Sequence, residues 1–488
     1  MRVVRDLDRL EAEIALAGAE AAAAFGDGTV FVEPYVERGR HVEVQVVGDT
    51  PGAVEVYGER DCSLQRRHQK VVEESPAPCL PDATRTALHD AARAAAAAVS
   101  YVGAGTVEFL YDPSTDRFYF LEMNTRLQVE HPVPEAVHGV DLVALQIAVA
   151  EGRPVTPAPA PSGHAVEVRL YAEDPAADYA PQSGLVTAIE VPEGPGLRVD
   201  AGYESGSEVS TFYDAMLAKV VAHAPAREQA ARVLAGALSR ARIHGVRTNR
   251  DRLVTVLRDP DFLAGRVSTA YLEEHPSAPN AIDGDHAVAA ALALAERDRL
   301  DRRVQQGVPV AWRNVPSQPQ VTRFTRSSAQ TAPRSAAHAD DPISVGWWGG
   351  RDGYVVEALR VVAASPTSVT LERDGVATTY AVAISGARVD VDAPGGHVAL
   401  TTIPRFTDPA DAVASGSLLA PMPGTVVSVA VEKGQQVTAG QPVLVLEAMK
   451  MQHTVTAPGA GTVTQLDVRP GVQVAAGEIL AVVEETTE

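Results

Sequence analysis

The sequence predicts an α+β protein of several domains, and three observations carry this prediction. The first half of the chain mixes period-2 strand patterns with an Ala-rich helical stretch. A helical pattern over Asp285–Gln306 then precedes alternation over Ser344–Ile403, which predicts a helix followed by a small antiparallel barrel. Finally, the C-terminal segment repeats itself, which predicts a β-sandwich.

Length and charge limit the classes of protein. The 488 residues are enough for three or four domains. A formal net charge of −21 disfavours nucleic acid and anionic membranes as partners. No apolar run approaches membrane-spanning length, no signal peptide opens the chain, and Cys62 and Cys79 alone imply neither a disulfide framework nor a zinc site. We therefore expect a cytoplasmic protein.

The C-terminal repeat points to one lysine. The stretch Ala420–Val426 returns as Ala457–Val463, and later glycines return at the same offset. Because each copy is Val-rich, alternating and cut by glycine, we expect each copy to form one small sheet of a pseudo-symmetric sandwich. The hairpin that joins the copies carries Ala-Met-Lys-Met, and it would present Lys450 to solvent.

Near the N-terminus, Asp6 is expected to cap a helix, and Thr29–Val32 is expected to form a strand. The next stretch, His41–Val46, alternates cleanly, so polar residues share one face and valines the other. The polar residues are His41, Glu43 and Gln45. From this segment alone we favour a half-solvated strand whose polar residues have no function over a functional face. Thr84–Val99 should be a helix that packs on a sheet.

The run Gln65–Lys70 concentrates cations and amides in an acidic protein. Such a run is either a solvated charge cluster or the binding surface for an anionic ligand, and we favour the ligand.

Two further strands, Gly105–Tyr111 and Phe118–Glu122, are separated by turn residues. If Tyr111 pairs with Tyr119, Glu108 comes to lie opposite Glu122. Two carboxylates across a hairpin repel each other unless a cation such as Mg²⁺ or Mn²⁺ lies between them. The alternative is a different register with both carboxylates on the surface.

The second of these strands is expected to continue as an extended segment. It would align an acid, an amide, a cation, an amide and an acid on one face, namely Glu122, Asn124, Arg126, Gln128 and Glu130. This row is either solvated or a site for metal, phosphate and a small anion.

The Ala448–Met451 tip resembles the biotinyl domain of biotin-dependent carboxylases. That resemblance implies that Lys450 carries biotin in an amide bond, which a biotin protein ligase would form. Lipoyl domains share the architecture but usually place Asp before the lysine and Ala after it. Met449 and Met451 therefore favour biotin.

A second resemblance is to biotin carboxylase, an ATP-grasp enzyme, over roughly the first 275 residues. It rests on several motifs in order: His41–Glu43, Arg60–Ser63, Gln65–Glu74, Glu122–Pro132, Gly163–Arg169, Ala172–Pro175 and Tyr213–Met216. It implies a partial ATP-grasp domain over 1–150 and a biotin carboxylase C-terminal domain over 151–276. A helix and linker (277–342), a β-barrel-like domain (343–410) and a biotinyl domain (415–486) would follow.

Carried over by position, this resemblance implies a role for each matching residue. The ATP contacts would be Glu33, Pro34, Tyr35, Val36, His41, Gln65 and His68. The Mg²⁺ or Mn²⁺ ligands would be Glu108, Glu122 and Asn124. Bicarbonate would bind Lys70, Arg126, Gln128 and Val129. The catalytic residues would be Arg126, Glu130 as the base and Arg198, which would stabilise the enolate of biotin.

The front of the chain departs from that family, which has a further N-terminal domain and a Gly-rich phosphate loop. Here Met1–Arg5 resembles the sequence that follows this loop, and neither G-x-x-x-x-G-K-[ST] nor G-x-G-x-x-G occurs downstream at a strand-to-helix turn. We therefore expect a truncated subunit or a misassigned start, with a nucleotide site that lacks one side.

The helix and barrel are similar to the subunit-docking domain of acyl-CoA carboxylase α subunits, although a generic β-domain is an alternative. Asp408–Ser417 would be a tether for the biotinyl domain. Taken together, the resemblances imply an α subunit that carboxylates biotin on Lys450 with ATP and bicarbonate. A carboxyltransferase β subunit would pass the carboxyl group to an acyl-CoA in a hetero-oligomer. The alternatives are a non-catalytic biotin carrier or scaffold and a urea or other non-CoA carboxylase.

Overall fold

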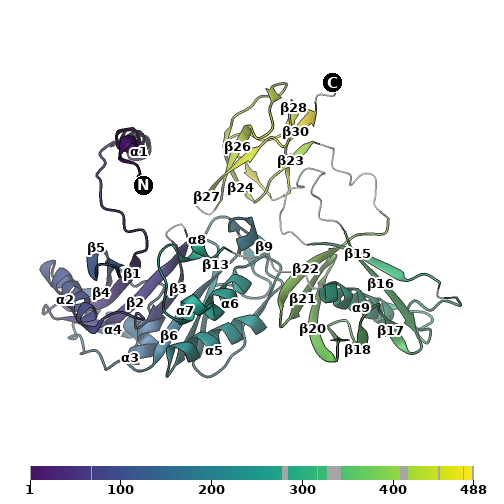
Figure 1. Cartoon of the computed structure of the whole chain (residues 1–488), viewed down its shortest axis with the longest axis horizontal. Coiled ribbons are helices and arrows are strands. Elements are labelled where there is room, and N and C mark those ends of the chain that lie inside the picture. Colours follow the sequence, from purple (N-terminus) through teal and green to yellow (C-terminus); the bar gives the residue numbers. More distant parts are fainter. Residues whose placement is uncertain are drawn as a thin grey trace.

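A computed structural model shows a chain organised around two eight-stranded sheets and a small C-terminal sandwich (Figure 1). The structure describes residues 2–66, 69–276, 284–315, 317–326, 342–406, 416–448, 451–475 and 477–485.

Strands and helices between Arg40 and Glu274 form one α+β unit around the first eight-stranded sheet. Its strands, in spatial order, are β11 (Leu197–Ala201), β13 (Met216–Ala224), β6 (His164–Tyr171), β3 (Gln69–Ser75), β2 (Val54–Arg66), β1 (Arg40–Gly48), β4 (Gly103–Asp112) and β5 (Arg117–Asn124). Neighbouring strands pair antiparallel throughout. We expected one domain over residues 1–150 and another over 151–276. The pairing of β3 with β6 joins strands from both of these ranges in one sheet.

The two faces of this sheet differ in chemistry. Two helices cover the apolar face, α2 (Asp82–Ala98) over β1 and β2, and α5 (Arg227–Arg240) over β6 and β13. The valines of β1 pack there against Leu88 and Ala92 of α2. On the opposite face lie the polar residues of β1, and Glu43 and Gln45 have no exposed surface. The favoured expectation of a half-solvated strand is therefore wrong, because the polar face is buried.

Further helices complete this unit. They are α3 (Pro132–His138), α4 (Leu142–Ala150), α6 (Arg250–Arg258), α7 (Pro260–Leu263) and α8 (Tyr271–Glu274). Short elements are β7 (Glu173–Asp174), η2 (Pro175–Ala177), β8 (Ala180–Pro181), β9 (Gly184–Leu185), β10 (Ala188–Glu190), β12 (Glu208–Val209) and β14 (Arg242–His244). Among the described residues no single helix could span a membrane; only α3 and α4 together satisfy the length and composition criteria, and a 93° bend separates them.

The N-terminal segment matches the prediction only in part. Asp6 caps the short helix η1 (Leu7–Arg9), which continues into α1 (Leu10–Phe25). Thr29–Val32 forms no strand, so that prediction was wrong. The segment contains three β-branched residues, yet Val32 is exposed and pairs with no neighbouring strand, and an isolated strand is not stable.

The second eight-stranded sheet closes around a helix. Its order is β17 (Gly353–Val355), β16 (Ile343–Gly350), β15 (Gln320–Arg326), β22 (Gly396–Thr402), β21 (Arg388–Ala393), β20 (Val376–Ser385), β19 (Ser368–Arg373) and β18 (Arg360–Ala364). A bridge between Val356 and Leu359 links the two terminal strands, so the sheet curls round α9 (Gly284–Asp301). Residues Asp285–Glu296 are buried on every side rather than on one predicted face.

The strand β15 lies inside residues 277–342, which we expected to contain only a helix and a linker. Phe324 of β15 is fully buried in the barrel core, and this burial decides its structure. The turn prediction at Arg373-Asp374-Gly375 is confirmed, since Asp374 and Gly375 both take positive φ between β19 and β20.

The C-terminal repeat forms two four-stranded sheets. One contains β23 (Ser417–Leu419), β30 (Ile479–Glu485), β28 (Gly461–Leu466) and β25 (Gln436–Val437), and the other contains β27 (Met451–Thr456), β26 (Pro442–Ala448), β24 (Gly424–Val429) and β29 (Gln473–Val474). Each sheet therefore takes two strands from each copy of the repeat, and our expectation of one sheet per copy was wrong. The copies exchange strands, which buries the apolar face of each copy against the other.

Candidate functional site

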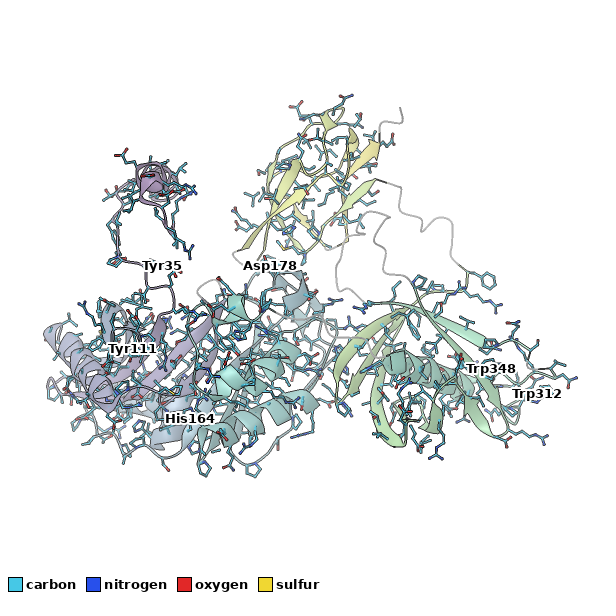
Figure 2. The ribbon with its side chains drawn as sticks, viewed as in Figure 1. Tyr35, Tyr111, His164, Asp178, Trp312 and Trp348 are labelled. Atoms are coloured by element: carbon cyan, nitrogen blue, oxygen red, sulfur yellow. The ribbon has the colours of Figure 1, made fainter. Side chains whose placement is uncertain are left out.

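The buried polar face of the first sheet gathers most of the residues singled out in the sequence. Strands β1 to β6 present charged side chains toward the segment 125–131 and helix α3. Figure 2 draws the side chains crowded together around this sheet. It shows Tyr35 away from the sheet, on the segment that leads from α1 to β1, where Tyr35 is exposed.

Arg60 fixes the centre of this face from strand β2. It has no exposed surface, and its guanidinium donates to Glu43 Oε1 at 2.6 Å and to Gln45 Oε1 at 2.7 Å. It also donates to Thr106 Oγ1 at 3.0 Å and to Gln128 Oε1 at 3.1 Å. Four partners on three separate elements make Arg60 the anchor that holds β1, β4 and the segment after β5 together.

Lys70, on β3, is the hub of a carboxylate cluster. Its Nζ donates to Glu43 Oε2 at 2.5 Å, to Glu130 Oε1 at 2.5 Å and to Glu108 Oε1 at 3.1 Å. His41 Nε2 lies 2.9 Å from the other oxygen of Glu108. Gln65 Nε2 in turn lies 2.6 Å from His41 Nδ1. One ammonium group thus gathers three carboxylates at a site that is only slightly exposed.

The charges in this cluster stabilise one another. Burial alone would raise the pKa of Glu43, but Lys70 and Arg60 hold it well below its usual range. Burial also opposes ionisation of Glu108, yet the bond to His41 and the charge of Lys70 lower its pKa. Burial would lower the pKa of Lys70, and Glu43 raises it instead. At neutral pH the cluster therefore contains a cationic Lys70 between ionised Glu43 and Glu108.

The carboxylate pair at the hairpin of β4 and β5 is confirmed. Glu108 lies directly opposite Glu122, as predicted, but Tyr111 pairs with Phe118 rather than Tyr119. A β-bulge next to Glu108 absorbs the difference of one residue. Asn124 Nδ2 bridges the two acids, at 3.0 Å from Glu108 Oε1 and 3.2 Å from Glu122 Oε1.

The donor set of this pair fits a divalent cation. The two carboxylates supply oxygen atoms of the kind that Mg²⁺ and Mn²⁺ prefer. Asn124 meets them through Nδ2, so its amide would have to rotate to offer its oxygen to an ion. Glu108, Glu122 and Asn124 would hold the ion, and the exposed Glu122 leaves one side open to a ligand. The ion would supply positive charge to a bound polyphosphate.

Replacing Glu122 with glutamine tests this assignment. Because the ion would lose one charged ligand, the Mg²⁺-dependent affinity for nucleotide should fall by at least about 10-fold. Loss of a residue that only supports a metal ligand already lowers affinity by about that factor. Calorimetric titration of MgADP measures it. Glu228→Gln, an exposed glutamate on α5, is the matched control and should leave affinity unchanged. Equal affinity in both variants would refute the paired-carboxylate site.

The chain after Asn124 leaves the extended conformation, so the predicted continuous strand was wrong. Residues 125–131 turn back over the sheet instead. This fold still brings Gln128 Nε2 to Glu108 Oε1 at 2.9 Å and Glu130 to Lys70. Arg126 is exposed, and its Nη1 donates to the Leu127 carbonyl at 3.4 Å. The carbonyl oxygen of Val129 accepts from Lys219 Nζ at 2.6 Å.

Arg169 is the main site residue that the sequence analysis missed. It extends from β6, donates through Nη2 to Glu130 Oε2 at 2.9 Å and through Nε to Glu73 Oε1 at 2.5 Å. Arg198, predicted for the site, instead contacts Glu135 Oε2 at 2.9 Å and is 47% exposed in its side chain. The signal for Arg169 was available, because His164–Tyr171 alternates and puts polar residues on one face.

The remaining predicted positions lie elsewhere. Glu33–Val36 forms a segment without regular structure, exposed except at the half-buried Val36, and the Arg5 guanidinium lies over the Tyr35 ring. His68 and Lys450 lie outside the described residues. The strands on either side of Lys450, β26 and β27, do pair antiparallel, with Ala448 opposite Met451, so the predicted hairpin at this position is confirmed.

Family models match three parts of the chain. Residues 1–157 match the ATP-binding domain of the carbamoyl-phosphate synthase L chain, and residues 167–274 match the biotin carboxylase C-terminal domain. Residues 416–483 match a model described as biotin-requiring enzyme.

Curated relatives match nearly the whole chain. The methylcrotonoyl-CoA carboxylase subunit alpha of Dictyostelium discoideum is 36% identical over 493 residues, which cover 93% of this chain and 68% of the relative. The propionyl-CoA carboxylase alpha chain of Ruegeria pomeroyi is also 36% identical, over 89% of this chain and 68% of the relative. The chain thus spans about two thirds of the length of these relatives.

Solved structures of biotin carboxylases are similar to more than half of the chain. Biotin carboxylase from Campylobacter jejuni, solved with an ATP analogue, is 44% identical with a TM-score of 0.54, over 56% of this chain and 62% of that one. The biotin carboxylase domain of Hydrogenobacter thermophilus 2-oxoglutarate carboxylase, solved with MgADP and bicarbonate, is 40% identical with a TM-score of 0.54, over 56% of this chain and 61% of that one.

Proposed function

The chain belongs to the family of biotin-dependent acyl-CoA carboxylase α subunits, and on that premise we propose that it carboxylates biotin with ATP and bicarbonate. The observation that carries the proposal is the cluster in which Lys70 and Arg169 both contact Glu130. Two cations beside a buried carboxylate form a suitable place for a small anion and a base that must remove its proton.

Bicarbonate would bind between Lys70 and the exposed Arg126, with Gln128 and the Val129 backbone beside it. Glu130 would take its proton as one bicarbonate oxygen forms a bond to the γ-phosphorus of ATP and ADP leaves. This reaction crowds negative charge, so the cations on this face lower its barrier. A divalent ion held by Glu108, Glu122 and Asn124 would add charge at the phosphates.

We assign the group that faces biotin to Arg169 rather than to Arg198. The nitrogen of the biotin ureido group is a poor nucleophile, and a guanidinium near the ureido oxygen favours its deprotonated form. Arg169 contacts the proposed base directly, whereas Arg198 is paired with Glu135 and Asp200. Arg198 remains the assignment that the family resemblance implies, and variants of the two residues distinguish them.

The other proposed ligands follow the same scheme. Adenine would lie along Glu33–Val36, with His41, Gln65 and His68 nearer the phosphates. The deprotonated ureido nitrogen of biotin on Lys450 would take the carboxyl group from the carboxyphosphate as inorganic phosphate leaves. A β subunit docked on the barrel around α9 would then transfer the carboxyl group to an acyl-CoA in a hetero-oligomer. Both cysteines are free thiols, which suits a reducing compartment such as the cytoplasm.

Replacing Lys450 with alanine should abolish biotin on the chain. A streptavidin blot after coexpression with a biotin protein ligase measures it. Lys433→Ala, another exposed lysine of the same domain, is the matched control and should stay fully labelled. Labelling that survives Lys450→Ala would show that a different lysine is the acceptor.

The proposed reaction is tested by ATP-dependent incorporation of labelled bicarbonate into free biotin by the purified chain. Incorporation excludes the non-catalytic carrier or scaffold as the whole function. A chain that is biotinylated and binds MgADP but fixes no bicarbonate would favour that carrier. Copurification of an acyl-CoA carboxyltransferase, rather than a urea-processing partner, separates the acyl-CoA carboxylase from the remaining alternative.

A further inference from the structure

Two carboxylates beside Arg169 have no part in the reaction proposed above. Glu73 on β3 and Glu167 on β6 are direct cross-strand partners, and neither has any exposed surface. Directly opposed residues of an antiparallel pair hold their Cβ atoms about 4.5–5.5 Å apart on the same face. The two carboxyl groups are therefore close neighbours in the interior.

Their oxygen atoms are mostly without donors. Glu73 Oε1 accepts from Arg169 Nε at 2.5 Å. The other three oxygens, Glu73 Oε2 and both of Glu167, find no hydrogen-bond donor in the part of the chain that the structure describes. Two ionised carboxylates in this arrangement would repel each other and would leave buried negative charge unpaired.

The cations around the pair are already engaged. Arg169 bonds Glu73 and Glu130, and Lys70 bonds Glu130 and two further carboxylates. Lys219 donates to the Val129 carbonyl and lies 3.4 Å from Asp200. These cations and acids are the charged groups that face the pair from β3, β6, β13 and the segment 125–131.

Water is kept from the pair by helix α3. Val133 and Val137 of this helix pack on Ala165 and Val221, which flank Glu167 on the same face of the sheet. Burial and then the neighbouring Glu73 raise the pKa of Glu167 well above its usual range. Burial likewise raises the pKa of Glu73, to about 7, despite the charge of Arg169.

We propose that Glu167 is a carboxylic acid whose proton is shared with Glu73, and that this pair positions Arg169 against Glu130. One proton accounts for two of the three oxygens, because the Glu167 hydroxyl then donates to the free Oε2 of Glu73. The third, the carbonyl oxygen of Glu167, belongs to a neutral acid group and costs less to bury than an ionised one. Glu73 keeps its negative charge and holds Arg169 through Oε1. The shared proton is a property of the fold alone, and only its catalytic consequence rests on the proposed function.

The proposal gives the pair a defined response to pH. Above about pH 7 the pair holds one proton and Glu73 is an anionic partner for Arg169. As the pH falls through about 7, Glu73 takes up a proton as well. The pair then holds two protons, and Arg169 loses its anionic partner. Arg169 then depends on Glu130 alone for its position, so we expect biotin carboxylation to decline on the acid side of this titration.

Infrared spectroscopy of the full chain with ¹³C-labelled glutamate tests the shared proton without any activity. At about pH 8 the wild type should show a carboxylic acid C=O stretching band, which only a protonated glutamate gives. Glu167→Gln should remove the band, and Glu228→Gln on the exposed face of α5 should keep it. A band that is missing in the wild type, or that persists in both Glu167→Gln and Glu73→Gln, would overturn the proposal.

The positioning role is tested on the same chain by kinetics. Glu167→Leu removes the proton donor and should lower kcat for biotin carboxylation by about 10-fold to 100-fold, a typical penalty for a misplaced catalytic group. Glu167→Gln, whose amide can still donate to Glu73, should restore most of kcat. Equal losses in both variants would refute positioning by hydrogen bonding. A wild type that shows the infrared band but fixes no bicarbonate would instead refute the proposed function.

Discussion

Replacing Arg60 with methionine is expected to lower the free energy of unfolding of the first sheet by about 3–5 kcal/mol, the range for breaking a buried ion pair from one side. Glu43 would keep Lys70 but lose the guanidinium, and it would remain without exposed surface. Gln45, Thr106 and Gln128 would each lose a donor as well. Methionine fills a similar volume, so lost charge and hydrogen bonds dominate the effect.

Hydrogen exchange of the β1 and β2 amides is the suitable measurement, because a chain of several domains does not unfold in two states. Arg38→Met is the matched control. Arg38 pairs with Glu274 at 2.6 Å on the surface, and such a pair contributes at most about 1 kcal/mol. If Arg60→Met and Arg38→Met change exchange equally, Arg60 does not anchor the polar face.

The effect of Arg60→Met should also depend on pH. The folded-state pKa of Glu43 lies below its unfolded value, so its ionised form stabilises the fold above the unfolded pKa. That contribution is lost as the pH falls through the folded pKa. The difference between wild type and variant should therefore be greatest at neutral pH and smaller in acid.

The residues at the hairpin of β4 and β5 show what local patterns can predict. Turn residues at Asp112–Arg117 and alternation on both sides specify two antiparallel strands, which the structure confirms. The pairing of Glu108 with Glu122 was predicted from a register that is wrong by one residue at Tyr111. The bulge between Glu108 and Phe109 restores the pairing, and period-2 alternation carries no signal for a bulge.

The convergence of the site could not be predicted in the same way. Glu43, Glu108 and Arg169 lie on β1, β4 and β6, which are far apart in sequence, and only the strand order of the sheet brings them to one face. A strand pattern states which face a side chain occupies, but not which strand lies beside it. Glu130 was singled out as the end of a polar row on an extended segment, and its role came from the family resemblance. Its contact with Lys70 instead depends on the turn at residues 125–131.

The C-terminal repeat illustrates the same difference between local and global order. The two copies predict two equivalent sets of strands, and the structure contains them. Strand β26 of the first copy nevertheless pairs with β27 of the second, and β28 of the second pairs with β25 of the first. Equivalent strands fit either partner equally well by sequence, so burial of the common core selects the exchanged arrangement.

Replacing Arg169 with methionine should lower kcat/KM for the carboxylation of free biotin by about 10²–10³-fold, the usual loss when one donor to developing negative charge is removed. Arg198→Met should change it by no more than about fivefold, as for an exposed ion pair. Both variants remove one guanidinium from the same sheet, so each is the control for the other. Initial rates of ATP-dependent bicarbonate incorporation measure the difference.

The dependence on biotin concentration separates the roles that Arg169 could have. A guanidinium that stabilises charge on the ureido oxygen acts mainly in the transition state, so its loss should fall on kcat. Bicarbonate-dependent ATP hydrolysis in the absence of biotin reports the step that needs Glu130 alone. If Arg169 only held Glu130 in place, Arg169→Met should lower this hydrolysis by the same factor as biotin carboxylation. A large loss in Arg198→Met with a nearly active Arg169→Met would instead favour the assignment that the family resemblance implies, and it would mean that Arg198 leaves Glu135 when biotin binds.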